Sequence, residues 1–121
     1  MGNRRYAPGV ARARFNDVVL EGIVTTDATG HANSINFPGV TADVANVWQG
    51  VGEYHFPLQD KFKSFLGAKV AVRKNTDPGV RWYIKDFSSN VLSIQFANLS
   101  SPPAAVNLTE ATFYVQITME K

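Results

Sequence analysis

Acid–base or metal chemistry in this chain would have to come from its two histidines and ten acidic residues, because it has no cysteine. His31 and His55 are far apart in the sequence, and neither stands at the spacing of a metal-binding motif. Glu53 and Asp60 share one segment, but the separation of a glycosidase pair depends on tertiary structure. Asp60 is better explained as the N-cap of a short helix.

A covalent nucleophile is equally hard to find. The sequence contains no Gly-x-Ser-x-Gly elbow and no glycine-rich phosphate loop. We therefore expect no catalytic residue, no metal and no cofactor, and a protein that is not an enzyme.

Base stacking is a third kind of chemistry, and the strand expected at 80–87 has suitable residues for it. Trp82 and Tyr83 alternate with Arg81 and Lys85. Aromatic and basic side chains on one sheet can stack bases and hold phosphates, as in oligonucleotide-binding barrels. A carbohydrate-binding module is another possibility, if Trp48 and Trp82 are exposed and stack on sugar rings.

The alternation of a strand favours a simpler interpretation of the same residues. Trp82 and Ile84 point to one face, so we expect them to fill the core. Tyr83 and Lys85 point to the other face, toward solvent or a partner. We predict that Tyr83 and Lys85 belong to a protein interface.

Positive charge is concentrated at the N-terminus. Four of the twelve basic residues and none of the ten acidic residues lie in residues 1–14, so this arm carries +4 and the rest of the chain −2. The slightly acidic body disfavours a phosphate groove. The arm residues predicted to contact a partner are Arg4, Arg5, Tyr6, Arg12 and Arg14.

The arm allows three interpretations. It could be a solvated tail, it could dock on nucleic acid, or it could cross onto a neighbouring subunit. Fully extended, it would reach about 45 Å, which is far enough to leave its own domain. We favour the subunit contact, in which the arginines pair with carboxylates of the neighbour and Tyr6 is an anchor.

The rest of the chain reads as one all-β domain at 15–121. Its 121 residues suit a single domain, and no apolar run approaches the ~20 residues that span a bilayer. Short apolar runs separated by turn residues predict an antiparallel β-sandwich or a jelly-roll-like barrel. Strands are expected at 15–25, 34–37, 43–49, 53–58, 68–74, 80–87, 91–96 and 110–120.

A glycine position and a change in the spacing of apolar residues predict two further details of these strands. Gly22 predicts a bulge or bend inside the first strand. The segment 50–67, GVGEYHFPLQDKFKSFLG, combines a glycine turn, an alternating strand and then apolar residues three and four apart. That change of period predicts a short helical turn that begins near Asp60 and ends at Gly67.

The same segment carries a resemblance to a known group of proteins. With the terminal strand ATFYVQITMEK, it resembles small virion proteins of tailed bacteriophages. In that group a similar glycine–aromatic segment precedes an L-x-D-x-[FY] step and a leucine-bearing turn. The matching positions are Gly52, Tyr54, Phe56, Leu58, Asp60, Phe62 and Leu66.

The resemblance implies a structural role in the virion, as a minor capsid, decoration or cement protein assembled in the host cytoplasm. Its partners would be the major capsid protein or other virion subunits, together with copies of itself, most often as a trimer. An adaptor of the tail, neck or baseplate is the alternative within this class. A single-stranded nucleic-acid-binding barrel is the alternative outside it.

Overall fold

The computed structural model describes residues 17–74 and 79–121, which form eight strands and no helix. This confirms the all-β prediction. The strands are β1 (Asp17–Thr26), β2 (Ala32–Asn36), β3 (Trp48–Gly50), β4 (Glu53–Pro57), β5 (Ser64–Arg73), β6 (Val80–Ser88), β7 (Val91–Asn98) and β8 (Thr112–Glu120).

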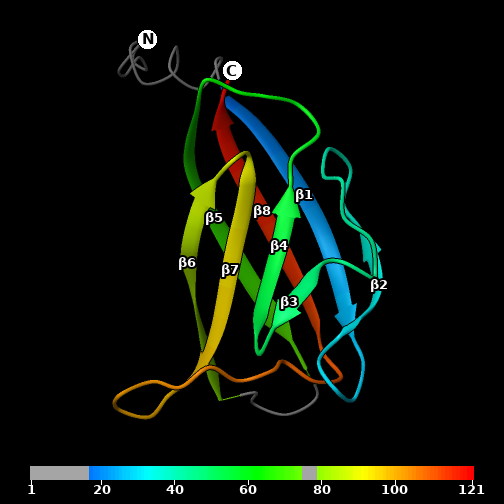
Figure 1. The fold of residues 1–121 in the computed structure, drawn as a ribbon, viewed down its shortest axis with the longest axis vertical. Coiled ribbons are helices and arrows are strands. Elements are labelled where there is room, and N and C mark those ends of the chain that lie inside the picture. Colours follow the sequence, from blue (N-terminus) through cyan, green and yellow to red (C-terminus); the bar gives the residue numbers. More distant parts are fainter. Residues whose placement is uncertain (1–16, 75–78) are drawn as a thin grey trace, which may run out of the picture.

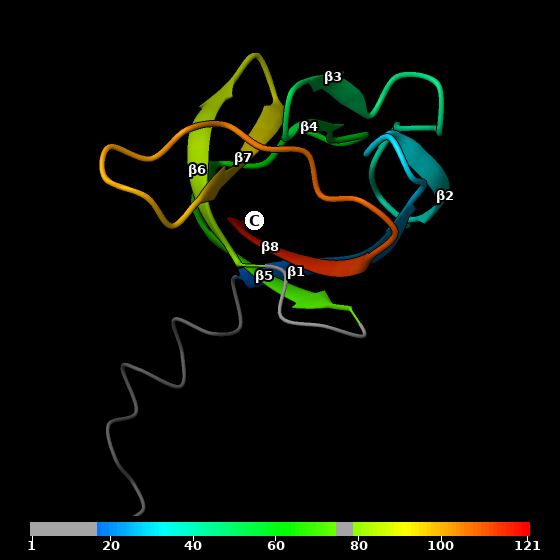
Figure 2. The same cartoon turned by 90° about the horizontal axis from the view of Figure 1, so that it is seen from below.

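The strands form two antiparallel four-stranded sheets that pack face to face as a β-sandwich (Figures 1 and 2). Sheet I has the order β2-β1-β8-β5, and sheet II has the order β3-β4-β7-β6. The loop at 99–111 crosses the lower end of the sandwich, where Figure 2 shows it passing between the two layers. Leu108 and Ala111 of this loop are buried and close the core at that end.

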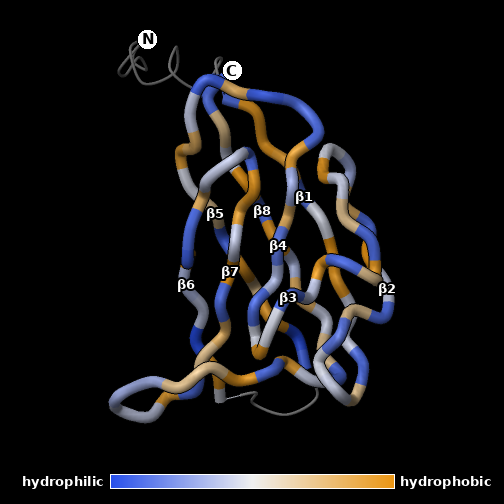
Figure 3. Tube along the Cα trace, in the orientation of Figure 1, coloured by the Kyte–Doolittle hydropathy of each residue, from blue (hydrophilic) through white to orange (hydrophobic). Residues whose placement is uncertain are grey.

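The core lies between the sheets and is built by alternation along the strands. Phe113, Val115, Ile117 and Met119 of β8 are buried, as the alternating pattern predicts, and the residues between them are half-buried on the outside. Figure 3 shows the corresponding alternation of hydrophobic and hydrophilic positions. The largest fully buried side chains from the other strands include Tyr54, Phe56, Leu92, Ile94 and Phe96.

Gly22 and Gly52 are each required for a different structural reason. The register between β1 and β8 runs unbroken through Gly22, so the glycine forms no bulge in this pairing. A Cβ on Gly22 would lie 2.1 Å from the ring of Phe37, and the glycine therefore makes room for that ring. Gly52 forms the predicted turn between β3 and β4 with a φ of +67°, and a Cβ there would lie 2.2 Å from the carbonyl oxygen of Val106.

The predicted helical turn after Asp60 is wrong, because other groups take the hydrogen bonds that it needs. The side-chain amide of Asn90 donates to the carbonyl oxygens of Leu58 and Asp60 at 3.1 and 3.0 Å. The amide of Lys63 donates to the carbonyl of Glu120, and strand β5 begins at the next residue. The segment is therefore an extended connection into sheet I.

Candidate protein-interaction site

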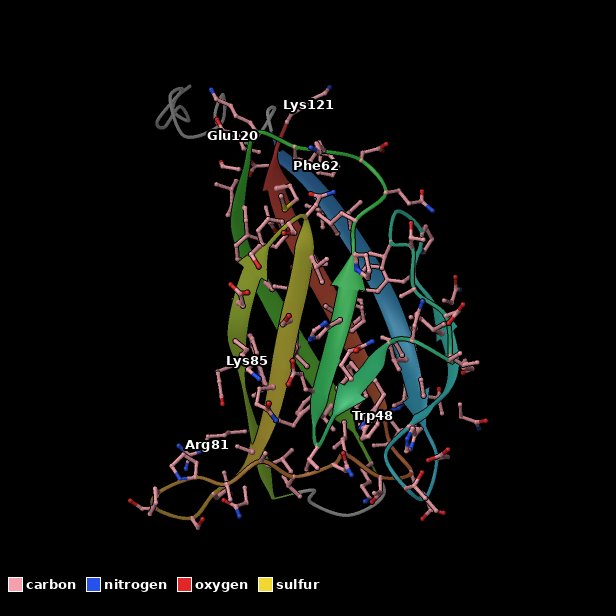
Figure 4. All side chains as sticks on the ribbon, viewed as in Figure 1. Trp48, Phe62, Arg81, Lys85, Glu120 and Lys121 are labelled. Atoms are coloured by element: carbon pink, nitrogen blue, oxygen red, sulfur yellow. The ribbon has the colours of Figure 1, made fainter. Side chains whose placement is uncertain are left out.

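The predicted interface residues fall into two groups. Arg4, Arg5, Tyr6, Arg12 and Arg14 lie outside the described residues. Tyr83 and Lys85 lie on β6 with their side chains on the outer face of sheet II, as predicted, Tyr83 opposite Gln95 of β7 and Lys85 beside Glu53. Lys85 is labelled in Figure 4. Tyr83 is 47% exposed.

Lys85 reaches the outer face through a bulge. The register between β6 and β7 shifts between Ile84 and Asp86, so Lys85 is the extra residue. Trp82 packs against the core as expected, but Ile84 is 36% exposed and does not fill it. Ile84 is still paired in register with the buried Ile94, but it lies on the edge strand of sheet II.

An acidic side chain holds Lys85 within its own sheet. Glu53 of β4 accepts a hydrogen bond from Lys85 Nζ at 2.8 Å and lies 2.6 Å from His55 Nε2. The bonds from Lys85 and then His55 lower the pKa of the Glu53 carboxyl, despite partial burial. The same contact with Glu53 raises the pKa of Lys85. Lys85 is therefore already paired and offers little charge to a partner.

Other polar side chains on the outer face of sheet II also have hydrogen-bond partners within the protein. Ser93 and Gln95 of β7 are buried although they point outward, because the neighbouring strands cover them. Gln95 Nε2 donates to the carbonyl oxygens of Val51 and Phe96. Arg81, whose charge the nucleic-acid interpretation used, donates to the carbonyls of Asn98 and Ser100. These polar side chains of the outer face are therefore hydrogen-bonded within the protein.

The two tryptophans proposed as sugar platforms are both partly buried against the core. The Trp48 ring lies 4.0 Å from that of His31, and its Nε1 donates to Asn107 Oδ1 at 3.1 Å. The same oxygen accepts a bond from the Gly52 amide at 2.7 Å. Trp48 therefore fixes the 99–111 loop to the end of the sandwich.

The outer face of sheet I is different, because it leaves large apolar side chains in solvent. Val19 and Ile23 of β1 are 47% and 48% exposed, and Leu66 of β5 is 51% exposed. Leu66 is the extra residue of a bulge between Phe65 and Gly67 in the pairing with β8. This bulge turns Leu66 outward rather than into the helical turn that its spacing suggested.

Two open hollows lie on this face. The larger, of about 700 Å³, is lined by residues of β1, β5 and β8, among them Val19, Leu66 and Gly67. No atom lies within 4 Å of the position that a Cβ of Gly67 would take, so the missing side chain leaves space. The smaller, of about 270 Å³, lies between Ile23 and Ala71.

In the middle of this face, the negative and the positive charge lie on different strands. Glu21 lies on β1 and Lys69 on β5, in one row across Gln116 of β8. Glu21 accepts a hydrogen bond from Tyr114 Oη at 2.5 Å, which raises the pKa of that phenol. Within the described part of the chain, Lys69 makes no salt bridge.

The upper end of sheet I is tied together by another carboxylate. Glu120 accepts a hydrogen bond from Ser64 Oγ at 2.7 Å and lies 3.7 Å from Lys63 Nζ. The Ser64 bond and then the Lys63 charge lower the pKa of this carboxyl. These contacts link β8 to the start of β5.

The outer face of sheet I was not among the predicted sites, although the sequence of β1 holds a signal for it. Its apolar residues occupy both parities of the strand, since Val18 and Leu20 point inward while Val19 and Ile23 point outward. A strand with water on one side alternates instead. Apolar residues on both sides of the strand indicate that its outer side is also covered by another surface.

Over residues 17–74 and 79–121, no three His, Asp or Glu side chains come together in a way that could hold a metal ion. The same residues include no helix that could cross a membrane. Comparison of the chain with protein-family models, with curated proteins and with solved structures gives no match.

Proposed function

We propose that this chain is a non-enzymatic structural protein that works by binding other protein subunits through the outer face of sheet I. The observation that carries the proposal is the exposure of Val19 and Leu66 beside one open hollow and of Ile23 beside a second. Several large apolar side chains exposed on one face are typical of interaction sites. The ionic and hydrogen-bonded groups of sheet II give a matched surface without that character.

The setting of this function comes from the resemblance of 50–67 and the terminal strand to virion proteins of tailed phages. In that setting the partners are capsid subunits and other copies of this chain, which acts as a decoration, cement or minor capsid protein. The arm at 1–14 adds a second, basic contact. A rigid sandwich with a separate binding segment suits such a role, because the sandwich loses little conformational entropy when it binds.

Virus particles purified from cells that carry this gene test the proposal. We expect the chain to be present in the particles in a fixed ratio to the major capsid protein, by quantitative mass spectrometry. Particles that lack the chain would contradict the virion role.

Variants of the same gene then test the face. Val19→Asp should reduce incorporation strongly, and Tyr83→Asp is the control, because both side chains are 47% exposed. Deletion of residues 1–14 should also reduce incorporation while leaving a folded sandwich, since β1 begins only at Asp17. Equal incorporation of the Val19→Asp and Tyr83→Asp proteins would show that sheet I is not the binding face.

A further inference from the structure

The outer face of sheet I is complementary to itself across its central strand. β8 pairs with β1 on one side and β5 on the other, so each outward residue of β8 lies in a row between one residue of each neighbour. Along three successive rows the residues of β1 are apolar, acidic and apolar, and those of β5 are small, basic and small. The rows are Val19–Thr118–Gly67, Glu21–Gln116–Lys69 and Ile23–Tyr114–Ala71.

We infer that the partner of this face is a second copy of the chain, docked sheet I to sheet I about a two-fold axis that runs along β8. The inference rests on the proposed function, because it takes this face as the protein-binding one. A two-fold axis makes an interface in which the same patch serves both copies. With the axis along β8, β1 of each copy lies over β5 of the other at the same level.

The apolar rows then fit by size. Val19 of one copy meets the hollow beside Leu66 and Gly67 of the other. Ile23 meets Ala71, where the second hollow lies. Large side chains opposite small ones allow two sheet faces to interdigitate.

The charged row fits by sign. Glu21 of each copy faces Lys69 of the other, which gives two symmetric ion pairs. This row is the middle one of the five outward positions on β1, from Asp17 to Thr25. Packed sheets rotate by about 30° relative to each other, and a rotation about the centre moves the middle row least.

The other two-fold arrangement, with the axis across the strands, is unfavourable. It would place β1 over β1 and bring Glu21 against Glu21 and Lys69 against Lys69. Like charges that face each other across an interface oppose association. In the middle row the charge pattern therefore favours the axis along β8. At the end of the face this axis brings Glu120 of the two copies together, where Lys63 Nζ lies 3.7 Å from each carboxylate.

The area of the face suits a reversible dimer. Strands spaced by about 4.8 Å with a rise of about 3.3 Å per residue give sheet I a face of about 500 Å². Both copies together then bury about 1,000 Å², near the lower limit for a specific interface. We expect a dimer that dissociates in the micromolar range.

Sedimentation equilibrium of the full chain, from about 5 to about 500 μM, tests this inference. The mass of the wild-type protein should rise from 13.3 kDa toward twice that value. Glu21→Lys and Lys69→Glu should each weaken the dimer by about tenfold or more, because each places like charges in the middle row. The combined variant with both substitutions should regain the wild-type dissociation constant within about threefold.

The combined variant also separates the interface from folding, since recovery of the dimer requires a folded chain. A wild-type chain that remains monomeric, one that forms a trimer, or a combined variant that stays dissociated would overturn the inference. This result is independent of the particle experiment. Particles can contain a chain that is monomeric in solution, which removes only the dimer, and they can lack a chain that dimerises, which removes only the virion role.

Discussion

On sheet II, Glu53 lies between Lys85 and His55 and its side chain is only 20% exposed, whereas on sheet I Glu21 is exposed and its charge faces no basic side chain of the described residues. The two outer faces also differ in their apolar residues. Sheet II buries Ser93 and Gln95 of its central strand, whereas sheet I leaves Val19, Ile23 and Leu66 in water. A surface that has satisfied its own groups gains little by binding, while exposed apolar area gains free energy when a partner covers it.

The largest expected effect comes from a charge placed in the apolar part of sheet I. Val19→Asp should weaken self-association by about a hundredfold or more, because a buried unpaired carboxylate carries a large desolvation cost. Sedimentation of the variant measures this, with circular dichroism as a control for folding. Tyr83→Asp on sheet II should change the dissociation constant by less than about twofold.

Removing Glu53 from sheet II should change the free energy of unfolding more than removing Glu21 from sheet I. Glu53→Ala should lower the free energy of unfolding by about 1–2 kcal/mol, because it leaves Lys85 and His55 without their shared acceptor. Glu21→Ala should change it by less than about 0.5 kcal/mol, since this side chain is exposed. Urea unfolding of dilute protein, where the dimer is dissociated, gives both values, and equal losses would contradict the contrast.

The pairing of Glu53 with Lys85 and His55 on sheet II should also make the stability of the protein depend on pH in the acid range. Because Lys85 and His55 lower the pKa of Glu53 in the folded protein, the unfolded chain takes up this proton at a higher pH. The stabilisation is therefore complete above an unfolded pKa of about 4.3 and is lost as the pH falls through the lowered folded pKa. Glu53→Gln should show a smaller fall in urea midpoint between neutral and acid pH than the wild type.

Salt should have the smallest effect and should act on sheet I. The Glu21 and Lys69 contacts across the dimer lie among partly solvated groups, so higher ionic strength should screen them. We expect the dissociation constant to rise by about two- to threefold between low and moderate salt. The combined Glu21→Lys and Lys69→Glu variant should respond equally, while a salt response lost in that variant would argue against the ion pairs.

Much of the fold was predictable because it depends on local pattern. The alternation of β8 and the turn at Gly52 follow from period and from glycine. The absence of the helical turn could not be predicted from the local sequence. It depends on Asn90, which is distant in sequence and donates hydrogen bonds to the carbonyl oxygens of Leu58 and Asp60. The role of Gly22 likewise depends on Phe37, which reaches it only in the folded sheet.

The candidate site was less predictable than the fold. The outward position of Tyr83 follows from alternation, but the pairing of Lys85 with Glu53 depends on a bulge and on the order of strands in sheet II. The rows that join Glu21 to Lys69 depend on the order of sheet I. Strand order is a tertiary property that one sequence does not reveal.

The most direct test of the protein-binding role of sheet I is the amide spectrum of the full chain, recorded by NMR at increasing concentration. We expect shifts that concentrate on the outward residues of β1, β8 and β5, with Glu21 and Lys69 among the most affected. The amides of Tyr83 and Lys85 should stay constant. Shifts centred on β6 and β7, or a spectrum that does not change with concentration, would contradict it.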